Sequence, residues 1–170
     1  MKEELKHNWR YEKILTVKEA KEKALELKRK GKTVVTTNGV FDIMHAGHLD
    51  ALEEYKRQGD VLFIGLNSDK SVREGKGEER PFVPEFERAA LLAALACVDY
   101  VVIIDAPYKE VQDVLLRTVK SQIHGNLDEY GEPDNWIEWP VMQEVGAKGY
   151  VCKRRPGLAT SDIITKIKAS

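Results

Sequence analysis

The sequence predicts an α/β fold, with a Rossmann-like, roughly five-stranded parallel sheet that has helices on both faces. Helical and strand patterns alternate along the chain, as they do in strand–helix–strand units. The expected strands are short and mostly apolar, which is typical of strands buried on both faces. A length of 170 residues is enough for one domain with its own core. We expect strands at residues 33–37, 61–66, 100–104, 121–124 and 150–153, and helices at residues 16–31, 45–58, 85–96, 108–120, 142–145 and 160–168.

The first helix carries clear start and stop signals. Thr16 and Glu19 have the spacing of a capping box, in which each side chain bonds the backbone N–H of the other residue. Apolar residues then recur at helical spacing, and Gly31 ends the helix. We interpret residues 1–31 as an N-terminal helical extension and residues 33–168 as the catalytic core of a single domain formed by the whole chain.

The later elements follow from composition and from turn residues. Residues 85–96 are rich in Ala and Leu, which are strong helix formers. Residues 100–104 are a run of Tyr, Val and Ile, which favours a strand. The Asp105-Ala106-Pro107 turn then leads into the helix at residues 108–120.

Two long segments have neither pattern. Residues 67–84 form a charged stretch with Gly and Pro, and loops of that length in a compact domain are usually functional. Residues 125–140 are also irregular and carry an aromatic cluster. We interpret Tyr130, Trp136 and Trp139 as a hydrophobic plug, with a lid or a cage for a quaternary amine as the alternative.

Composition limits the classes of partner. The formal net charge is −1 with no block of like charge, so we expect no nucleic-acid partner, and any anion site must be local. The first residues are too polar for a signal peptide, and the apolar runs are too short to cross a bilayer. We therefore expect a cytoplasmic protein with no membrane partner. Cys97 and Cys152 form no CxxC pair and are interpreted as core thiols.

A phosphate-binding pattern follows the first strand. The chain passes through a Gly-containing turn into a helix that begins with His45 and His48. The N–H groups at a helix N-terminus attract phosphate, and Gly47 leaves room for a phosphate chain against the backbone. Two imidazoles one turn apart lie on the same face of the helix, so both can donate to that phosphate. The pattern predicts a nucleotide-phosphate site that supports chemistry.

Six sequence blocks have the order and spacing of a known superfamily, the HxGH nucleotidyltransferases of the cytidylyltransferase type. Together they resemble most closely the heptose-1-phosphate adenylyltransferases, and the resemblance covers roughly residues 13–168. The blocks are Asn38-Gly39-Val40-Phe41-Asp42 with His45-Ala46-Gly47-His48, Gly65-Leu66-Asn67-Ser68-Asp69, Ser71-Val72-Arg73 with Lys76-Gly77, Arg80-Pro81, Pro84 with Glu87-Arg88-Ala89, and Val98-Asp99-Tyr100-Val101-Val102.

The resemblance implies transfer of a nucleoside monophosphate from a nucleoside triphosphate, with ATP favoured, to a phosphorylated sugar. Pyrophosphate would be released, and Mg²⁺ would accompany the triphosphate, although no metal ligand can be named. The acceptor phosphate is largely dianionic at neutral pH because its second pKa is about 6. It needs no general base, so catalysis would rest on positioning and on donors to the phosphate oxygens.

The resemblance also implies roles for particular residues. Lys76 would close over the α-phosphate, although a solvated loop lysine fits the same sequence. One of Arg154 and Arg155 would meet the phosphates, with the register open by one residue. The expected catalytic residues are His45, His48, Lys76, Arg154 and Thr160; the expected nucleotide-binding residues are Asn38, Gly39, Val40, Phe41, Gly47, Arg88, Gly125, Arg155 and Ser161; and the expected acceptor-binding residues are Asp42 and Asp69.

Three of these residues could instead have purely structural roles. Arg88 could form a plain ion pair with Glu85 or Glu87, Asp42 could order its own turn, and Asp69 could cap a helix. The stretch at residues 96–99 matches a segment that lies at a dimer interface in relatives, so we also expect a homodimer.

Two departures keep other acceptors open. Residues 154–164 resemble the RTEGISTSDII signature of phosphocholine-type cytidylyltransferases, with Pro156 and Ala159 in place of Glu and Ser. Residues 124–130 replace the Lys-Gly-Gly-Asp-Tyr-like turn of the adenylyltransferases. The alternative is therefore a CTP-dependent enzyme acting on glycerol 3-phosphate, phosphocholine, phosphoethanolamine or a phosphonate. FMN adenylylation, tRNA-synthetase activity and a non-catalytic nucleotide sensor are weaker alternatives.

Overall fold

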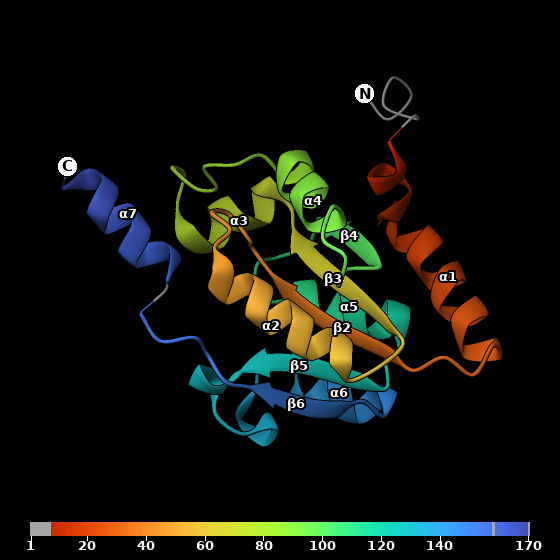
Figure 1. Ribbon diagram of the computed structural model, residues 1–170. Helices are drawn as coiled ribbons and strands as arrows, with labels where there is room; N and C mark the ends of the chain where they lie inside the picture. The colour runs from red at the N-terminus through yellow and green to blue at the C-terminus, as the bar shows by residue number, and fades with distance from the viewer. Residues whose placement is uncertain (1–7, 158, 170) are drawn as a thin grey trace.

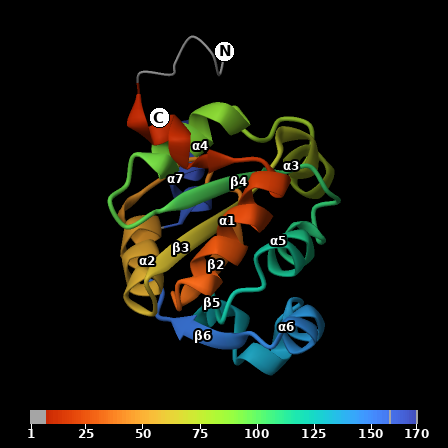
Figure 2. The same ribbon diagram turned by 90° about the vertical axis from the view of Figure 1, so that its right-hand side faces the viewer.

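The protein is described here by a computed structural model that covers residues 8–157 and 159–169. It is built on one sheet of six strands, all parallel, in the order β1-β4-β3-β2-β5-β6 (Figures 1 and 2). The strands are β1 (Ile14–Leu15), β2 (Val34–Gly39), β3 (Val61–Asn67), β4 (Tyr100–Ile104), β5 (Ile123–Leu127) and β6 (Lys148–Cys152). The α-helices are α1 (Val17–Arg29), α2 (Ala46–Arg57), α3 (Asp69–Lys76), α4 (Glu85–Ala93), α5 (Val111–Val119), α6 (Trp139–Val145) and α7 (Thr160–Lys168). Short 3₁₀ helices are η1 (Trp9–Lys13), η2 (Asp128–Tyr130) and η3 (Pro133–Asn135).

Helices cover both faces of the sheet, as expected. Helices α2 and α4 pack on one face and contribute Leu52 and Leu92 to its core. Helices α1 and α5 pack on the other face, where Ala24 and Leu115 are buried, and α6 lies beside α5 (Figures 1 and 2). The whole of β3 is buried, which explains its continuous apolar sequence.

The strand order reverses direction at β2. From β2 the chain builds outward through β3 to β4, then returns to place β5 on the opposite side of β2. Open α/β sheets bind ligands at the carboxyl ends of the strands beside such a switch point. The topology therefore places a binding crevice at the ends of β2 and β5.

Three local expectations need correction. The sheet has six strands where roughly five were expected, because β1 is too short to give a sequence pattern. Residues 67–84 are not all loop, since α3 forms at their start, capped by the Ser68 side chain on the N–H of Ser71. The fourth expected strand, at residues 121–124, lies at Ile123–Leu127.

The start of the chain agrees with its signals where it is described. Both hydrogen bonds of the capping box between Thr16 and Glu19 are present. Strand β1 pairs with β4, so part of the expected N-terminal extension belongs to the main sheet. The polar residues 1–7 and one position of the C-terminal signature, residue 158, lie outside the described residues.

Candidate active site

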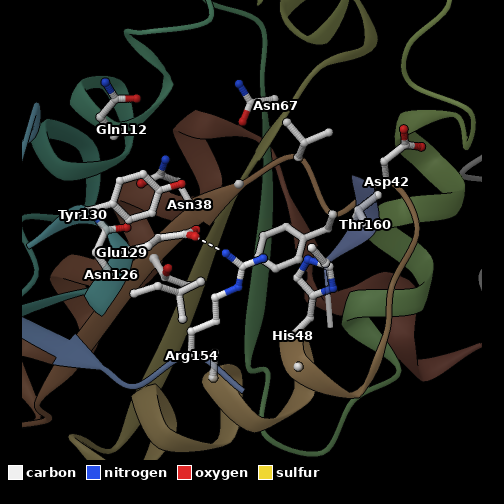
Figure 3. A pocket seen from close by; sticks show the side chains of 18 of the residues that line it. Asn38, Asp42, His48, Asn67, Gln112, Asn126, Glu129, Tyr130, Arg154 and Thr160 are labelled. Atoms are coloured by element: carbon white, nitrogen blue, oxygen red, sulfur yellow. Dashed lines mark hydrogen bonds and ion pairs between the residues drawn. The ribbon is translucent and has the colours of Figure 1, made fainter. Parts of the chain in front are cut away.

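An open cavity of about 640 Å³ lies at this switch point. It is lined by the turn after β2, the start of α2, the end of β5 and the start of α7 (Figure 3). Two helix N-termini, those of α2 and α7, therefore border the same space. Their unpaired N–H groups and partial positive charge favour an anion there.

His45 and His48 stand at the beginning of α2 and line this cavity. Their rings stack with centroids 4.0 Å apart and an interplanar angle of 29°. The backbone N–H of His45 donates to Nδ1 of His48 at 3.3 Å, so the neutral His48 ring carries its proton on Nε2. Nδ1 of His45 is buried without a partner. The pair thus keeps ring nitrogens available for a ligand.

The surroundings of both imidazoles favour the neutral form. Burial lowers the pKa of His48 to about 4, and the charges of His45 and Arg154 add to this effect. Burial, followed by the charge of Arg154, also lowers the pKa of His45. A bound polyphosphate would oppose these effects, because its negative charge favours the protonated rings.

The turn after β2 brings backbone close to the cavity. Phe41 has a positive φ of 49°, which is strained for a bulky residue and is most often seen at functional sites. A Cβ at Gly39 would lie 3.0 Å from the Phe41 ring, so this turn leaves little room for a side chain there. The side-chain oxygen of Asn38 is buried without a partner. All three residues, with Val40 and Gly47, line the cavity as predicted.

Arg154 reaches into the middle of the cavity, between His48 and the end of β5 (Figure 3). Its guanidinium forms an ion pair with Glu129, which also lines the cavity. The neighbouring Arg155 instead pairs with Asp50 at 3.0 Å and is absent from the cavity lining. The structure thus places Arg154 and not Arg155 in the cavity, and the contact of either arginine with nucleotide stays a prediction.

Helix α7 supplies a further wall of the cavity. Thr160 and Ser161 line the cavity in the first turn of this helix. The Thr160 hydroxyl donates to the Ile43 carbonyl at 3.3 Å, which ties α7 to the segment before α2. Ala159, where the family signature has Ser, also borders the cavity.

The family model for cytidylyltransferase-like proteins matches residues 36–165, which include all of these walls. The chain belongs to the cytidylyltransferase-like family. Among curated relatives, the Bifunctional protein HldE of Geobacter metallireducens is 42% identical over 142 residues, and that of Syntrophotalea carbinolica is 37% identical over 162 residues. These matches cover 82% and 95% of this chain but only 28% and 32% of the two relatives, so the chain spans about three tenths of their length.

Solved structures confirm the fold. A lipopolysaccharide core biosynthesis protein from Thermoplasma volcanium is 24% identical, with a TM-score of 0.58 over 74% of this chain and 98% of that one. A pantoate-beta-alanine ligase from Francisella tularensis is 12% identical, with a TM-score of 0.62 over 91% of this chain and 76% of that one.

In this cytidylyltransferase-like chain, Arg88 lies behind the cavity and not in it. Its side chain is fully buried, and its guanidinium donates to the carbonyls of Val40, Val83 and Asn67 at 2.6, 2.8 and 3.0 Å. It also pairs with Asp69 at 2.7 Å. The expected contacts of Arg88 with nucleotide and of Asp69 with acceptor are corrected, because both residues support the cavity wall from behind.

Asp42 and Gly125 also have structural neighbours. The Asp42 side chain is 1% exposed and accepts from Arg80 Nε at 2.6 Å and from the N–H groups of Phe82 and Val83 at 2.8 and 2.9 Å. Burial raises the pKa of Asp42, but these hydrogen bonds outweigh burial and lower it. Asp42 therefore orders the loop at residues 80–83 and also lines the cavity, so its expected contact with the acceptor stays a prediction. Gly125 faces the Tyr55 ring, where a Cβ would lie 2.3 Å away, and does not line the cavity.

Lys76 lines the cavity as expected, but from the last turn of α3 and not from a loop. Its pKa is lowered by burial and by the charge of Arg80, with Asp42 acting in the opposite direction. Arg80 also lines the cavity and was missed as a site residue. The sequence signal for Arg80 was the Arg80-Pro81 block, which is one of the six blocks of the family resemblance but had no assigned function.

Several polar residues of the cavity lining were missed: Asn67, Gln112, Asn126 and Glu138, together with Tyr108 and Lys109. The expected plug is confirmed for two members of the aromatic cluster: Trp136 is buried, its Nε1 donates to the Gly131 carbonyl at 2.9 Å, and Trp139 packs against the same cluster. Tyr130 is instead 57% exposed and lines the cavity.

Proposed function

We propose that this chain transfers a nucleoside monophosphate, preferentially from ATP, to a phosphorylated sugar of the heptose 1-phosphate class. The observation that carries the proposal is the stacked pair of imidazoles, His45 and His48, at a helix N-terminus in the cavity that Arg154 also lines. Such a group of donors suits a triphosphate. The family membership and the curated HldE relatives support the same reaction class.

The reaction begins with the acceptor phosphate as nucleophile. One of its oxygens forms a bond to the α-phosphorus of ATP, and the bond from that phosphorus to the bridging oxygen of pyrophosphate breaks. The bond electrons leave with pyrophosphate, so no proton has to be removed from the nucleophile. The protein therefore has to hold two anions in line and stabilise the charge that develops on the phosphate oxygens.

The cavity residues divide this work. His48 Nε2–H donates to a phosphate oxygen, since its Nδ1 is already occupied by the His45 N–H. Arg154 and the N–H groups at the start of α7 hold the β- and γ-phosphates, Lys76 stabilises the charge on the α-phosphate, and Arg80 neutralises the acceptor phosphate.

Mg²⁺ is proposed to arrive with the triphosphate. Within residues 8–157 and 159–169, no three His, Cys, Asp or Glu side chains are grouped to hold a metal ion. The site fits an ion coordinated mainly by phosphate oxygens and water. The bound ion would neutralise part of the triphosphate charge.

The cellular location, oligomeric state and partners of the enzyme are also proposals. No helix within the described part of the chain is long and apolar enough to cross a bilayer. We propose a cytoplasmic protein that acts as a homodimer through the segment around residues 96–99 and that has no nucleic-acid partner. Cytidylyl transfer to a phosphoalcohol remains the second candidate, favoured by Thr160 and Ser161 at the cavity.

Pyrophosphate release by the purified chain with Mg²⁺ tests the proposal. ATP and CTP are each combined with heptose 1-phosphate, glycerol 3-phosphate, phosphocholine and 2-hydroxyethylphosphonate, with His48→Ala as the blank. Turnover with ATP and heptose 1-phosphate is expected. Turnover only with CTP and a phosphoalcohol would replace the proposal by the second candidate, and nucleotide binding without any turnover would indicate a sensor.

A further inference from the structure

Helix α3 ends in a stretch that its own side chains hardly attach to the molecule. The helix buries two side chains, Ser71 and Val72, and both belong to its first half. Residues 73–76, which form its last turn, are exposed. Among the residues that the structure describes, no hydrogen bond or ion pair joins a side chain of residues 73–79 to another element. Lys76 nevertheless lines the cavity from this last turn.

The chain is firmly held on either side of this stretch. Before it, the Ser68 hydroxyl caps α3 and also donates to the Asp105 carboxylate at 3.2 Å. After it, Asp42 binds Arg80 and the backbone of the next residues. The polar contacts on both sides therefore stop short of the turn that carries Lys76.

The backbone around Lys76 is also the kind that is costly to order. Gly75 and Gly77 flank it, and Gly77 has a positive φ of 95° at the end of the helix. Glycine loses more conformational freedom on folding than any other residue. A lysine between two glycines keeps one position only if a contact from outside the segment holds it there.

The Tyr108 ring supplies such a contact. Tyr108 belongs to the turn between β4 and α5, which passes beside α3 (Figure 2). A Cβ at Gly75 would lie 2.1 Å from Cγ of Tyr108 and 2.3 and 2.5 Å from its Cδ atoms. Carbon atoms in contact are normally about 3.5–4.0 Å apart, so the ring occupies the place of the side chain that Gly75 lacks. Rotation of the ring about its own axis cannot move Cγ away, so the fit requires glycine.

We propose that Tyr108 is a positioning residue for Lys76. Its ring packs on Gly75 and holds the last turn of α3 so that the Lys76 side chain stays in the cavity. The inference rests on the proposed function, in which Lys76 stabilises charge on the α-phosphate, and it adds a residue that acts through Lys76. The ring and not the hydroxyl group makes the contact.

Steady-state pyrophosphate release from ATP and heptose 1-phosphate tests the consequence for turnover. Tyr108→Ala should lower kcat about ten- to a hundredfold, as a small misplacement of a catalytic group does, with a KM for ATP within about threefold of wild type. Tyr108→Phe keeps the ring and should keep kcat within about twofold of wild type. The control is Leu25→Ala, at an exposed apolar residue of α1 outside the cavity, which should keep wild-type rates.

Gly75→Ala tests the same contact from the other side. Alanine is a better helix former than glycine, so this substitution does not weaken α3 by its intrinsic propensity. Its Cβ takes the place of the ring, and kcat should therefore fall as it does in Tyr108→Ala. Wild-type kcat in Gly75→Ala would contradict the proposed packing.

A Lys76→Met background separates positioning from a general structural role. If Tyr108 acts through Lys76, Tyr108→Ala should change kcat by less than about twofold once the lysine is absent. Equal losses in the two backgrounds would overturn the proposal, as would wild-type kcat in Tyr108→Ala. An equal loss in Tyr108→Phe would also overturn it and would indicate that the hydroxyl group contacts a ligand.

Amide hydrogen exchange gives a measurement that does not depend on turnover. The N–H of Gly77 donates to the Arg73 carbonyl at 2.9 Å, so its exchange reports on the last turn of α3. Tyr108→Ala should accelerate exchange in residues 73–77 about tenfold or more and leave the buried strand β3 unchanged. Absence of pyrophosphate release by the wild-type chain would overturn the reaction, whereas unchanged exchange in folded Tyr108→Ala would overturn the positioning role.

Discussion

The backbone N–H of His45 donates to the Nδ1 atom of His48 at 3.3 Å, and the two rings stack with centroids 4.0 Å apart. This contact fixes the tautomer of His48, so its Nε2–H is a prepared donor in the cavity. Sequence spacing predicts that the two imidazoles share a helix face. The hydrogen bond adds a specific chemical state, in which one histidine orients the other.

Removal of the His48 donor should mainly reduce turnover. We expect His48→Ala to lower kcat about a hundred- to a thousandfold, as loss of one transition-state donor does, with a small change in the KM for ATP. Steady-state pyrophosphate release measures both constants. Glu53→Gln, an exposed carboxylate on the same helix, is the control and should keep wild-type rates. A comparable kcat for His48→Ala would show that the imidazole is not a catalytic donor.

The ion pair between Arg154 and Glu129 should compete with the triphosphate. The two side chains are 39% and 37% exposed, so the pair is weak, with an expected strength of about 1 kcal/mol or less. Glu129→Gln should therefore lower the KM for ATP by up to about fivefold, and Arg154→Gln should raise it about tenfold or more. An increase in KM for Glu129→Gln would contradict this and would indicate that Glu129 binds substrate or the triphosphate's metal ion.

Arg88 should be a stability residue. Its replacement by Met leaves three carbonyls and Asp69 without their donor, and loss of one partner of a buried pair costs about 3–5 kcal/mol. Denaturant unfolding should show this loss for Arg88→Met. The control Arg57→Met, at an exposed ion pair on α2, should change the free energy of unfolding by about 1 kcal/mol or less. Similar values for the two variants would refute the supporting role.

Stability should fall in mild acid. The pKa values of His48 and His124 are both lowered to about 4 in the folded state, chiefly by burial. The unfolded chain, with ordinary histidine pKa values of about 6.5, then binds more protons between these limits. The contribution of the two histidines to the free energy of unfolding is therefore complete above about pH 6.5 and is lost as pH falls through about 4.

Chemical denaturation between pH 7 and pH 4 measures this dependence. Each of the two histidines should contribute a slope of up to about 1.4 kcal/mol per pH unit. His48→Asn should remove the contribution of one histidine. A slope that is unchanged in His48→Asn would show that His48 titrates normally in the folded protein.

Much of the fold, and the part of the site around the two histidines, could be predicted from the sequence. Strand β4 lies at the residues expected, and the two histidines with Gly47 meet the cavity, because their signals are local in sequence. Helix α3 was missed because Val72 is its only apolar residue and most of its other residues are charged, so the sequence shows no apolar helical pattern. The glycine at position 75 is explained by packing, because the Tyr108 ring occupies the place that a Cβ would take.

The remaining errors concern residues whose roles depend on tertiary placement. Arg80 and Arg88 are equally charged and close in sequence, yet one lines the cavity and the other is fully buried behind it. Nothing in their local sequence separates these roles. The polar lining residues Gln112, Asn126 and Glu138 are still harder to predict from the sequence. They come from α5, from β5 and from the residue before α6, and only tertiary packing brings them to one cavity.

The most direct test of the proposed transfer is to follow the oxygen atoms. The chain is incubated with ATP, Mg²⁺ and heptose 1-phosphate labelled with ¹⁸O at the non-bridging oxygens of its phosphate, and the products are analysed by mass spectrometry. We predict that all of the label appears in a nucleoside diphosphate sugar, one labelled oxygen now joining the two phosphorus atoms, and that the pyrophosphate is unlabelled. Label in pyrophosphate, or formation of ADP in place of pyrophosphate, would contradict attack of the acceptor phosphate on the α-phosphorus.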